Sequence, residues 1–120
     1  VLQEMFPGVA AGDFSAAADA EVEDGSVHVG DLVIFEAEAC LCFGELLCMF
    51  HVKDECFAVA SKWKLLDSSA RGPHDVTFVR LNVCDDPMLV PLTCVRCALI
   101  HRLSNDGSAA SAYVPLGYSL

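Results

Sequence analysis

With 120 residues, of which 54% are hydrophobic, the chain is long enough for one domain with a buried core and too apolar to be disordered throughout. Charged residues interrupt every apolar stretch before the roughly 18 residues that a transmembrane helix requires. The net charge of −10 is concentrated in residues 1–38, which hold nine acidic residues and no Lys or Arg. This charge disfavours direct DNA binding and favours a basic peptide or protein as partner, although solubility alone also explains it.

Residues 1–26 are rich in Ala, Gly, Ser and acidic side chains, and we expect them to form a mostly flexible acidic leader. Within this leader, residues 14–22 have the composition of a short helix capped by Asp13 or Ser15. No secretory signal is recognisable. Because the first residue is Val rather than Met, we expect the chain to be a fragment of a longer protein.

Residues 27–120 are expected to form one all-β domain, because short runs rich in β-branched and aromatic residues alternate with turn sequences. Gly44 predicts a bulge or bend inside its strand, and Pro115 predicts that the last strand is an edge. Five or six short strands without a long helix indicate a small barrel or sandwich. The predicted strands are 27–36, 40–52, 56–66, 75–84, 93–103 and 112–118, with a short extended piece at 88–91 and loops at 67–74 and 104–111.

The seven cysteines are an odd number, so they cannot all pair within one chain. Most lie in apolar runs, where a free thiol behaves as a small buried hydrophobe. We therefore expect an intracellular, reducing location, the nucleus being one option.

Zinc binding is the alternative role for the cysteines. Cys94, Cys97 and His101, together with Cys40 and Cys42, supply enough ligand types for a tetrahedral site. However, residues three apart on a strand point to opposite faces, so Cys94 and Cys97 share a metal only if the strand breaks between them. The favoured expectation is therefore that the chain binds no cofactor.

Four segments in this order resemble the bromo-adjacent homology (BAH) module and related SH3-like barrels. They are Val-Gly-Asp-Leu-Val-Ile-Phe at 29–35, Phe-Gly-Glu-Leu-Leu at 43–47, the strand from Phe57 to Leu66 with its Trp, and Leu-Val-Pro-Leu-Thr-Cys-Val at 89–95. The resemblance covers about residues 27–103 and implies a small β-barrel that reads chromatin proteins or other partners. Similar modules also occur as accessory domains of proteins encoded by mobile elements.

The same resemblance implies a partner site, in some members an aromatic cage for methyl-lysine. The candidate aromatic residues are Phe43, Phe57 and Trp63, and the nearby acids are Glu45, Asp54 and Glu55. A cage needs exposed ring faces around a cation, whereas Phe57 and Trp63 fall on the apolar face of their strand, which favours core packing.

No nucleotide-binding glycine loop, serine-hydrolase elbow or zinc-protease motif is present, so an enzyme is not expected. The sequence thus predicts a non-catalytic module that recognises a basic peptide or protein, chromatin being one source of it. The alternatives are a structural accessory domain of a larger enzyme, such as a transposase or chromatin modifier, and a small zinc-binding domain.

Overall fold

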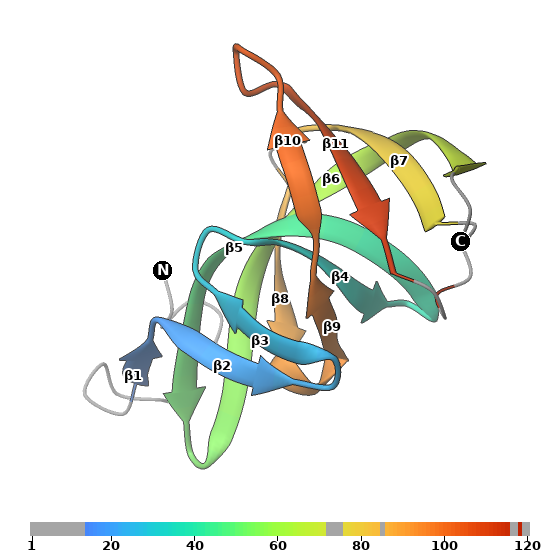
Figure 1. Ribbon diagram of the computed structural model, residues 1–120. Coiled ribbons are helices and arrows are strands. Elements are labelled where there is room, and N and C mark those ends of the chain that lie inside the picture. The colour runs from blue at the N-terminus through green and yellow to red at the C-terminus, as the bar shows by residue number, and fades with distance from the viewer. Residues whose placement is uncertain (1–13, 72–75, 85, 116–117, 119–120) are drawn as a thin grey trace.

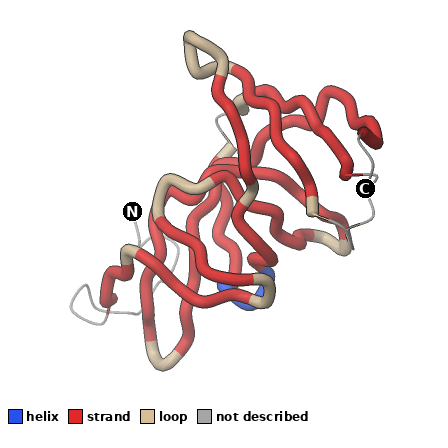
Figure 2. Tube along the Cα trace, viewed as in Figure 1, coloured by secondary structure: helices blue, strands red, loops and turns tan. Residues whose placement is uncertain are grey.

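The computed structural model describes residues 14–71, 76–84, 86–115 and 118, and this part of the chain is all-β (Figures 1 and 2). The one helical element among these residues is the short 3-10 helix η2 (Leu92–Cys94), and no described helix is long and apolar enough to cross a membrane. The strands are β1 (Phe14–Ala17), β2 (Asp19–Val22), β3 (Gly25–His28), β4 (Leu32–Ala37), β5 (Cys40–Val52), β6 (Glu55–Arg71), β7 (Val76–Asn82), β8 (Pro87–Pro91), β9 (Val95–Ala98), β10 (Ile100–Leu103) and β11 (Ala109–Val114).

Most strands form one curled, half-barrel sheet in the order β10-β11-β7-β6-β5-β4-β9. The two ends of this order, β9 and β10, are consecutive in the chain and are separated only by Leu99, so the sheet must curl to bring them together. The Leu99 N–H donates to the carbonyl of Leu32 at 2.8 Å, which holds the junction against β4. β1 adds to β5, β8 adds to β6, and the β2–β3 hairpin forms a separate ribbon over the lower half of the view in Figure 1.

Strand β4 is buried on both faces, which explains its uninterrupted apolar run. Leu32 and Ile34 pack into the first cluster, while Val33 and Phe35 pack into the second. The first cluster comprises Leu32, Ile34, Phe43, Trp63, Val79, Leu81, Cys97, Leu99, Ala110, Ala112 and Val114. The second cluster comprises Val27, Val33, Phe35, Cys42, Leu46, Met49, Ala58, Ala60, Val90 and Val95. The third, smaller cluster comprises Phe50, Val52 and Val59, with Phe14 and Phe57 packed against it.

Two expectations for the first forty residues meet different outcomes. The helix predicted within 14–22 is wrong, because β1 pairs with β5 and β2 pairs with β3, and tertiary pairing overrides the helical propensity of the alanines. The strand predicted over 27–36 is present in two parts, since Gly30 has a φ of 95° and lies between β3 and β4. Residues 1–13 of the expected leader lie outside the described residues, whereas 14–17 belong to the main sheet.

The later strands also differ from the predicted set. Residues 67–71 continue β6 instead of starting a loop, and the strand predicted over 93–103 is divided by η2 and Leu99. The last strand is not an edge, because β11 lies between β10 and β7 and Pro115 follows its end. The described residues contain eleven strand segments, more than expected, because β1 and β2 form within the expected leader and the predicted strands 27–36 and 93–103 are each divided.

Candidate functional site

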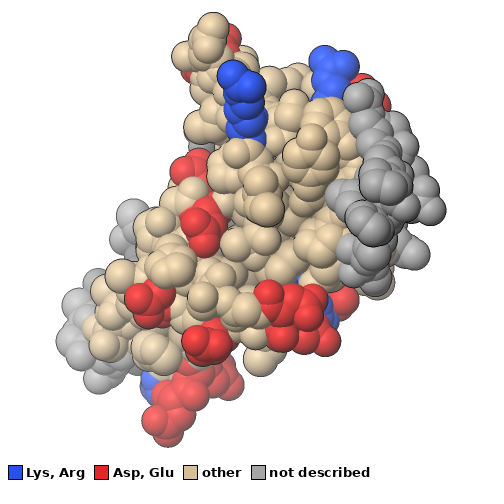
Figure 3. All heavy atoms as spheres, in the orientation of Figure 1, with Lys and Arg blue, Asp and Glu red and all other residues tan. Residues whose placement is uncertain are grey.

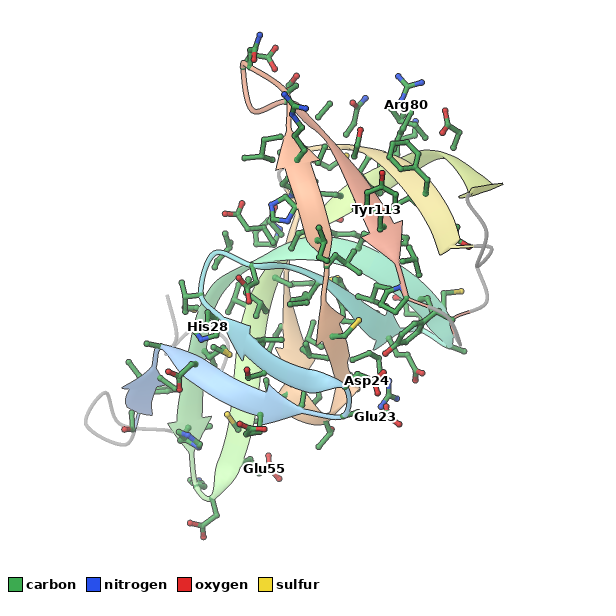
Figure 4. All side chains as sticks on the ribbon, viewed as in Figure 1. Glu23, Asp24, His28, Glu55, Arg80 and Tyr113 are labelled. Atoms are coloured by element: carbon green, nitrogen blue, oxygen red, sulfur yellow. The ribbon has the colours of Figure 1, made fainter. Side chains whose placement is uncertain are left out.

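A groove with a volume of about 680 Å³ lies between β2, the start of β6 and the end of β8 with η2. Three of the six residues predicted for a partner site line it: Asp54, Glu55 and Phe57. Figure 4 shows Glu23 and Glu55 in the lower half of the molecule, beside the β2–β3 hairpin and the β5–β6 turn. The full lining is Glu21, Val22, Glu23, Asp54, Glu55, Cys56, Phe57, Pro91, Leu92 and Thr93.

Four carboxylates surround this groove, and no Lys, Arg or His is among its lining residues. Glu21 and Glu23 are exposed on and just after β2, and Asp54 and Glu55 come from the tight β5–β6 turn. That turn has left-handed backbone at both central residues, Lys53 (φ 50°) and Asp54 (φ 67°), a conformation that Asp tolerates and that two-residue hairpins favour. The turn therefore sets the two β5–β6 carboxylates beside the groove.

The floor of the groove is apolar. Phe57 stacks on Phe50 with ring centroids 5.9 Å apart, and Pro91 lies directly opposite Phe57 in the β6–β8 ladder. Val22 and Leu92 pack against the second cluster. An apolar floor below a carboxylate rim suits a ligand that carries both aliphatic chain and positive charge.

The acidic hairpin beside the groove is held in place by Arg96 of β9. The Arg96 guanidinium contacts Glu23 at 2.9 Å and Glu36 at 3.0 Å, and these acids, Glu36 first, raise the pKa of the guanidinium. The backbone N–H of Asp24 donates to the carbonyl of Arg96 at 3.2 Å. Glu23 is thus already paired, whereas Glu21, Asp54 and Glu55 form no ion pair with any other described residue.

A second contact joins this hairpin to the C-terminal part of the chain. The Tyr118 hydroxyl donates to the Asp24 carboxylate. Burial and then this bond raise the pKa of Tyr118 well above its ordinary value, so the hydroxyl stays protonated. The ion pairs of Arg96 could not be predicted from the sequence, because its partners Glu36 and Glu23 are 60 and 73 residues away in the chain.

Phe43 and Trp63 do not lie with Phe57. They sit opposite each other in the β5–β6 ladder, 2% and 5% exposed, inside the first cluster, whereas Phe57 packs against the third. The three rings therefore do not surround one site. The indole N–H of Trp63 is buried and has no hydrogen-bond partner among the described atoms.

Glu45 is also separate from the groove. It is half-buried on β5 opposite Ser61 and lines a small cavity of about 130 Å³ together with Trp63 and His101. Asp54, Glu55 and Phe57 are thus the part of the predicted site that the structure brings together.

The cysteines and histidine of the zinc alternative lie on different parts of the fold. Cys94 packs against the second cluster from η2, Cys97 is buried in the first cluster on β9, and His101 is exposed on β10. Burial raises the pKa of the Cys97 thiol. Over residues 14–71, 76–84, 86–115 and 118, no three His, Cys, Asp or Glu side chains gather as a metal site would require.

One thiol–imidazole pair was not singled out from the sequence. Cys56, on the groove wall, lies 3.9 Å from Nε2 of His51, its direct partner in the β5–β6 ladder. Burial raises the pKa of the Cys56 thiol more than a backbone hydrogen bond from Phe57 lowers it. The raised pKa favours the neutral thiol over the thiolate, which is the nucleophilic form of cysteine.

Comparison of the chain with protein-family models, with curated proteins and with solved structures gave no match. The chemistry of the groove is therefore the basis for assigning a function.

Proposed function

We propose that this chain is a non-catalytic interaction module that binds a basic, extended peptide in the groove between β2, β6 and β8. The observation that carries the proposal is a rim of four carboxylates over an apolar floor, with no basic residue in the lining. A Lys or Arg side chain has the matching structure, because its aliphatic stem covers apolar surface while its charged end reaches carboxylate oxygens. Glu21, Asp54 and Glu55 are the acids available to it.

The family proposal is that the curled half-barrel sheet is a divergent SH3-like or BAH-like barrel. It is supported by the local geometry of the Val29-Gly30-Asp31 segment. Gly30 takes up the left-handed bend, and the Asp31 carboxylate accepts the backbone N–H of His28 at 2.8 Å. Under this proposal, histone-tail-like segments are the first basic peptides to examine, and the location is intracellular, which the seven unpaired thiols support.

The test is an NMR titration of the ¹⁵N-labelled chain with basic, histone-tail-like peptides, with and without lysine methylation. Binding in the groove should shift amides at 21–23, 54–57 and 92–93. Replacing Glu55 by Lys should weaken binding about tenfold, because one attraction becomes a repulsion at the rim. Glu38→Lys is the matched control, since Glu38 is an exposed acid outside the groove and its replacement gives the same charge change.

Absence of shifts across the peptide set in a folded sample would overturn the proposal. Equal losses for Glu55→Lys and Glu38→Lys would do so too, because they would indicate attraction to net charge rather than to the groove. In either case the structural accessory-domain alternative would take its place.

A further inference from the structure

Strand β10 is one end of the strand order of the main sheet. It pairs with β11 on one side and with no other described strand. All four of its residues are exposed, and Ile100 is 80% exposed, more than any other large hydrophobic residue of the described chain. An end strand with exposed apolar side chains is a template for a further strand unless charge, proline or a covering element blocks it.

The backbone of β10 has polar groups directed at that free side. Ser104 donates its N–H to the carbonyl of Ala109 at 2.8 Å, which makes residues 104 and 109 a hydrogen-bonded pair. Hydrogen-bonded and non-bonded pairs alternate along antiparallel strands, so the peptide groups of His101 and Leu103 point away from β11. The same alternation explains why the N–H of Leu99 reaches Leu32 on the other side.

The outer face beside this edge combines apolar and basic side chains in register. Ile100 lies opposite Tyr113, which is half exposed and makes an edge contact with Phe78 at 5.3 Å. The next row on the same face is Arg102, Ser111 and Arg80, directly opposite one another across β10, β11 and β7. Figure 4 shows Arg80 and Tyr113 near each other in the upper half of the molecule.

The second row provides two arginines in a chain that is acidic as a whole. A cavity of about 300 Å³ beside the second row is lined by Arg80 and Arg102 and by no acidic residue. Arg80 contacts Asp67 at 3.4 Å, and Arg102 forms no ion pair with any residue whose placement is described. Figure 3 shows basic atoms at the upper end of the visible face and most acidic atoms over its lower half. In a chain with a net charge of −10, this end attracts carboxylates.

We propose that β10 accepts an extended acidic segment of a partner protein as an additional strand of the sheet. The segment would hydrogen-bond to the peptide groups of His101 and Leu103. Its outward side chains would alternate between an apolar residue beside Ile100 and Tyr113 and a carboxylate at Arg102. This surface shares no residue with the acidic groove, so it stands independently of the basic-peptide proposal.

The test is an NMR titration of the full chain with a capped Glu-Val peptide, in which single Thr residues separate alternating Glu and Val so that Glu and Val lie on the same face of the strand. Binding should shift amides at 100–103 and 111–113 and slow hydrogen exchange at His101 and Leu103. The matched Lys-Val peptide, with Lys in place of each Glu, should bind at least fivefold more weakly. A Glu-Val peptide N-methylated at every residue should lose binding, since neither of its edges can donate to the strand ladder.

Two variants locate the site. Arg102→Glu should weaken binding of the Glu-Val peptide five- to tenfold, whereas Lys53→Glu, an exposed cation outside this surface, should leave it within twofold. Retained binding by the methylated peptide, or equal losses in the two variants, would overturn the proposal. Concentration-dependent self-association that blocks the peptide would overturn it in favour of a second copy of this chain as the occupant.

Discussion

At Gly44, the absence of one carbon atom allows two strands to approach. A Cβ atom there would lie 2.6 Å from the carbonyl oxygen of Ser61 and 3.0 Å from the ring of Phe35. The sequence predicted a bulge or bend at this glycine. Gly44 instead pairs regularly with Lys62, and the register shift in this ladder falls between Leu46 and Cys48.

Replacing Gly44 by Ala should lower the free energy of unfolding by about 3 kcal/mol, because backbone atoms cannot yield as a flexible side chain can. Gly107→Ala is the comparison, because Gly107 has open space around it but a φ of 74°. This replacement should lower the free energy of unfolding by about 1 kcal/mol. Urea unfolding followed by the fluorescence of Trp63, the single tryptophan, measures both. A Gly44 variant as stable as the Gly107 variant would contradict the crowding explanation.

The indole N–H of Trp63 is buried and has no acceptor within the described part of the chain. Trp63→Phe should change the free energy of unfolding by less than about 1 kcal/mol, because the loss of indole packing is offset by removing an N–H that has no acceptor. Phe43 lies opposite Trp63 and has no buried N–H whose removal would offset lost packing. Phe43→Leu should therefore lower the free energy of unfolding by about 1–2 kcal/mol. Circular dichroism during urea unfolding compares the two, and a Trp63 variant less stable than the Phe43 variant would show that the N–H is satisfied in solution.

At the scale of elements, the β10–β11 turn is fixed by one carboxylate. Asp106 accepts hydrogen bonds from the hydroxyls of Ser104 and Ser108 and from the backbone N–H of Ser108. These bonds, the backbone bond first, lower the pKa of Asp106 to about 2. The carboxylate form is therefore favoured by the folded turn.

Because this pKa is lowered on folding, the stabilisation by Asp106 should be complete above the ordinary aspartate pKa near 4 and should be lost as the pH falls through about 2. An NMR pH titration of the Asp106 carboxyl carbon and the Ser108 amide should give one midpoint near 2. A midpoint near 4 would show that the turn does not hold the carboxylate. Asp106→Ala should speed hydrogen exchange at Ser108 while leaving β5 and β6 unchanged.

The sequence predicted the elements whose signal is local. Strand 40–52 has the predicted bounds, and the turn after it is present. The prediction of one continuous strand over residues 93–103 was wrong. The strand is interrupted because β9 pairs with β4 whereas β10 pairs with β11, and a local sequence pattern does not contain this information. Likewise Asp54, Glu55 and Phe57 were found as neighbours in sequence, whereas Glu21 and Glu23 reach the same groove only through the β2–β3 hairpin.

For the whole molecule, the uneven charge distribution should make the two proposed surfaces respond alike to salt. Raising NaCl from 50 to 500 mM should weaken binding of the basic peptide to the groove and of the acidic peptide to β10 by about tenfold each. The reason is that salt screens attraction by positive and by negative surfaces equally. Fluorescence titrations at the two salt concentrations measure this. Salt-independent affinity at either surface would show that its charges are not the source of recognition.

The junction at Leu99 has a consequence for the order in which the fold is completed. Strand β4 receives one neighbour from β5 immediately after it, but its other neighbour, β9, is some 60 residues further along the chain. Until Val95–Ala98 has emerged during synthesis, the apolar Leu-Val-Ile-Phe strand has an open backbone edge, which is a template for pairing between chains. A chain shortened to end before Val95 should therefore aggregate, even though most of its strands would be intact.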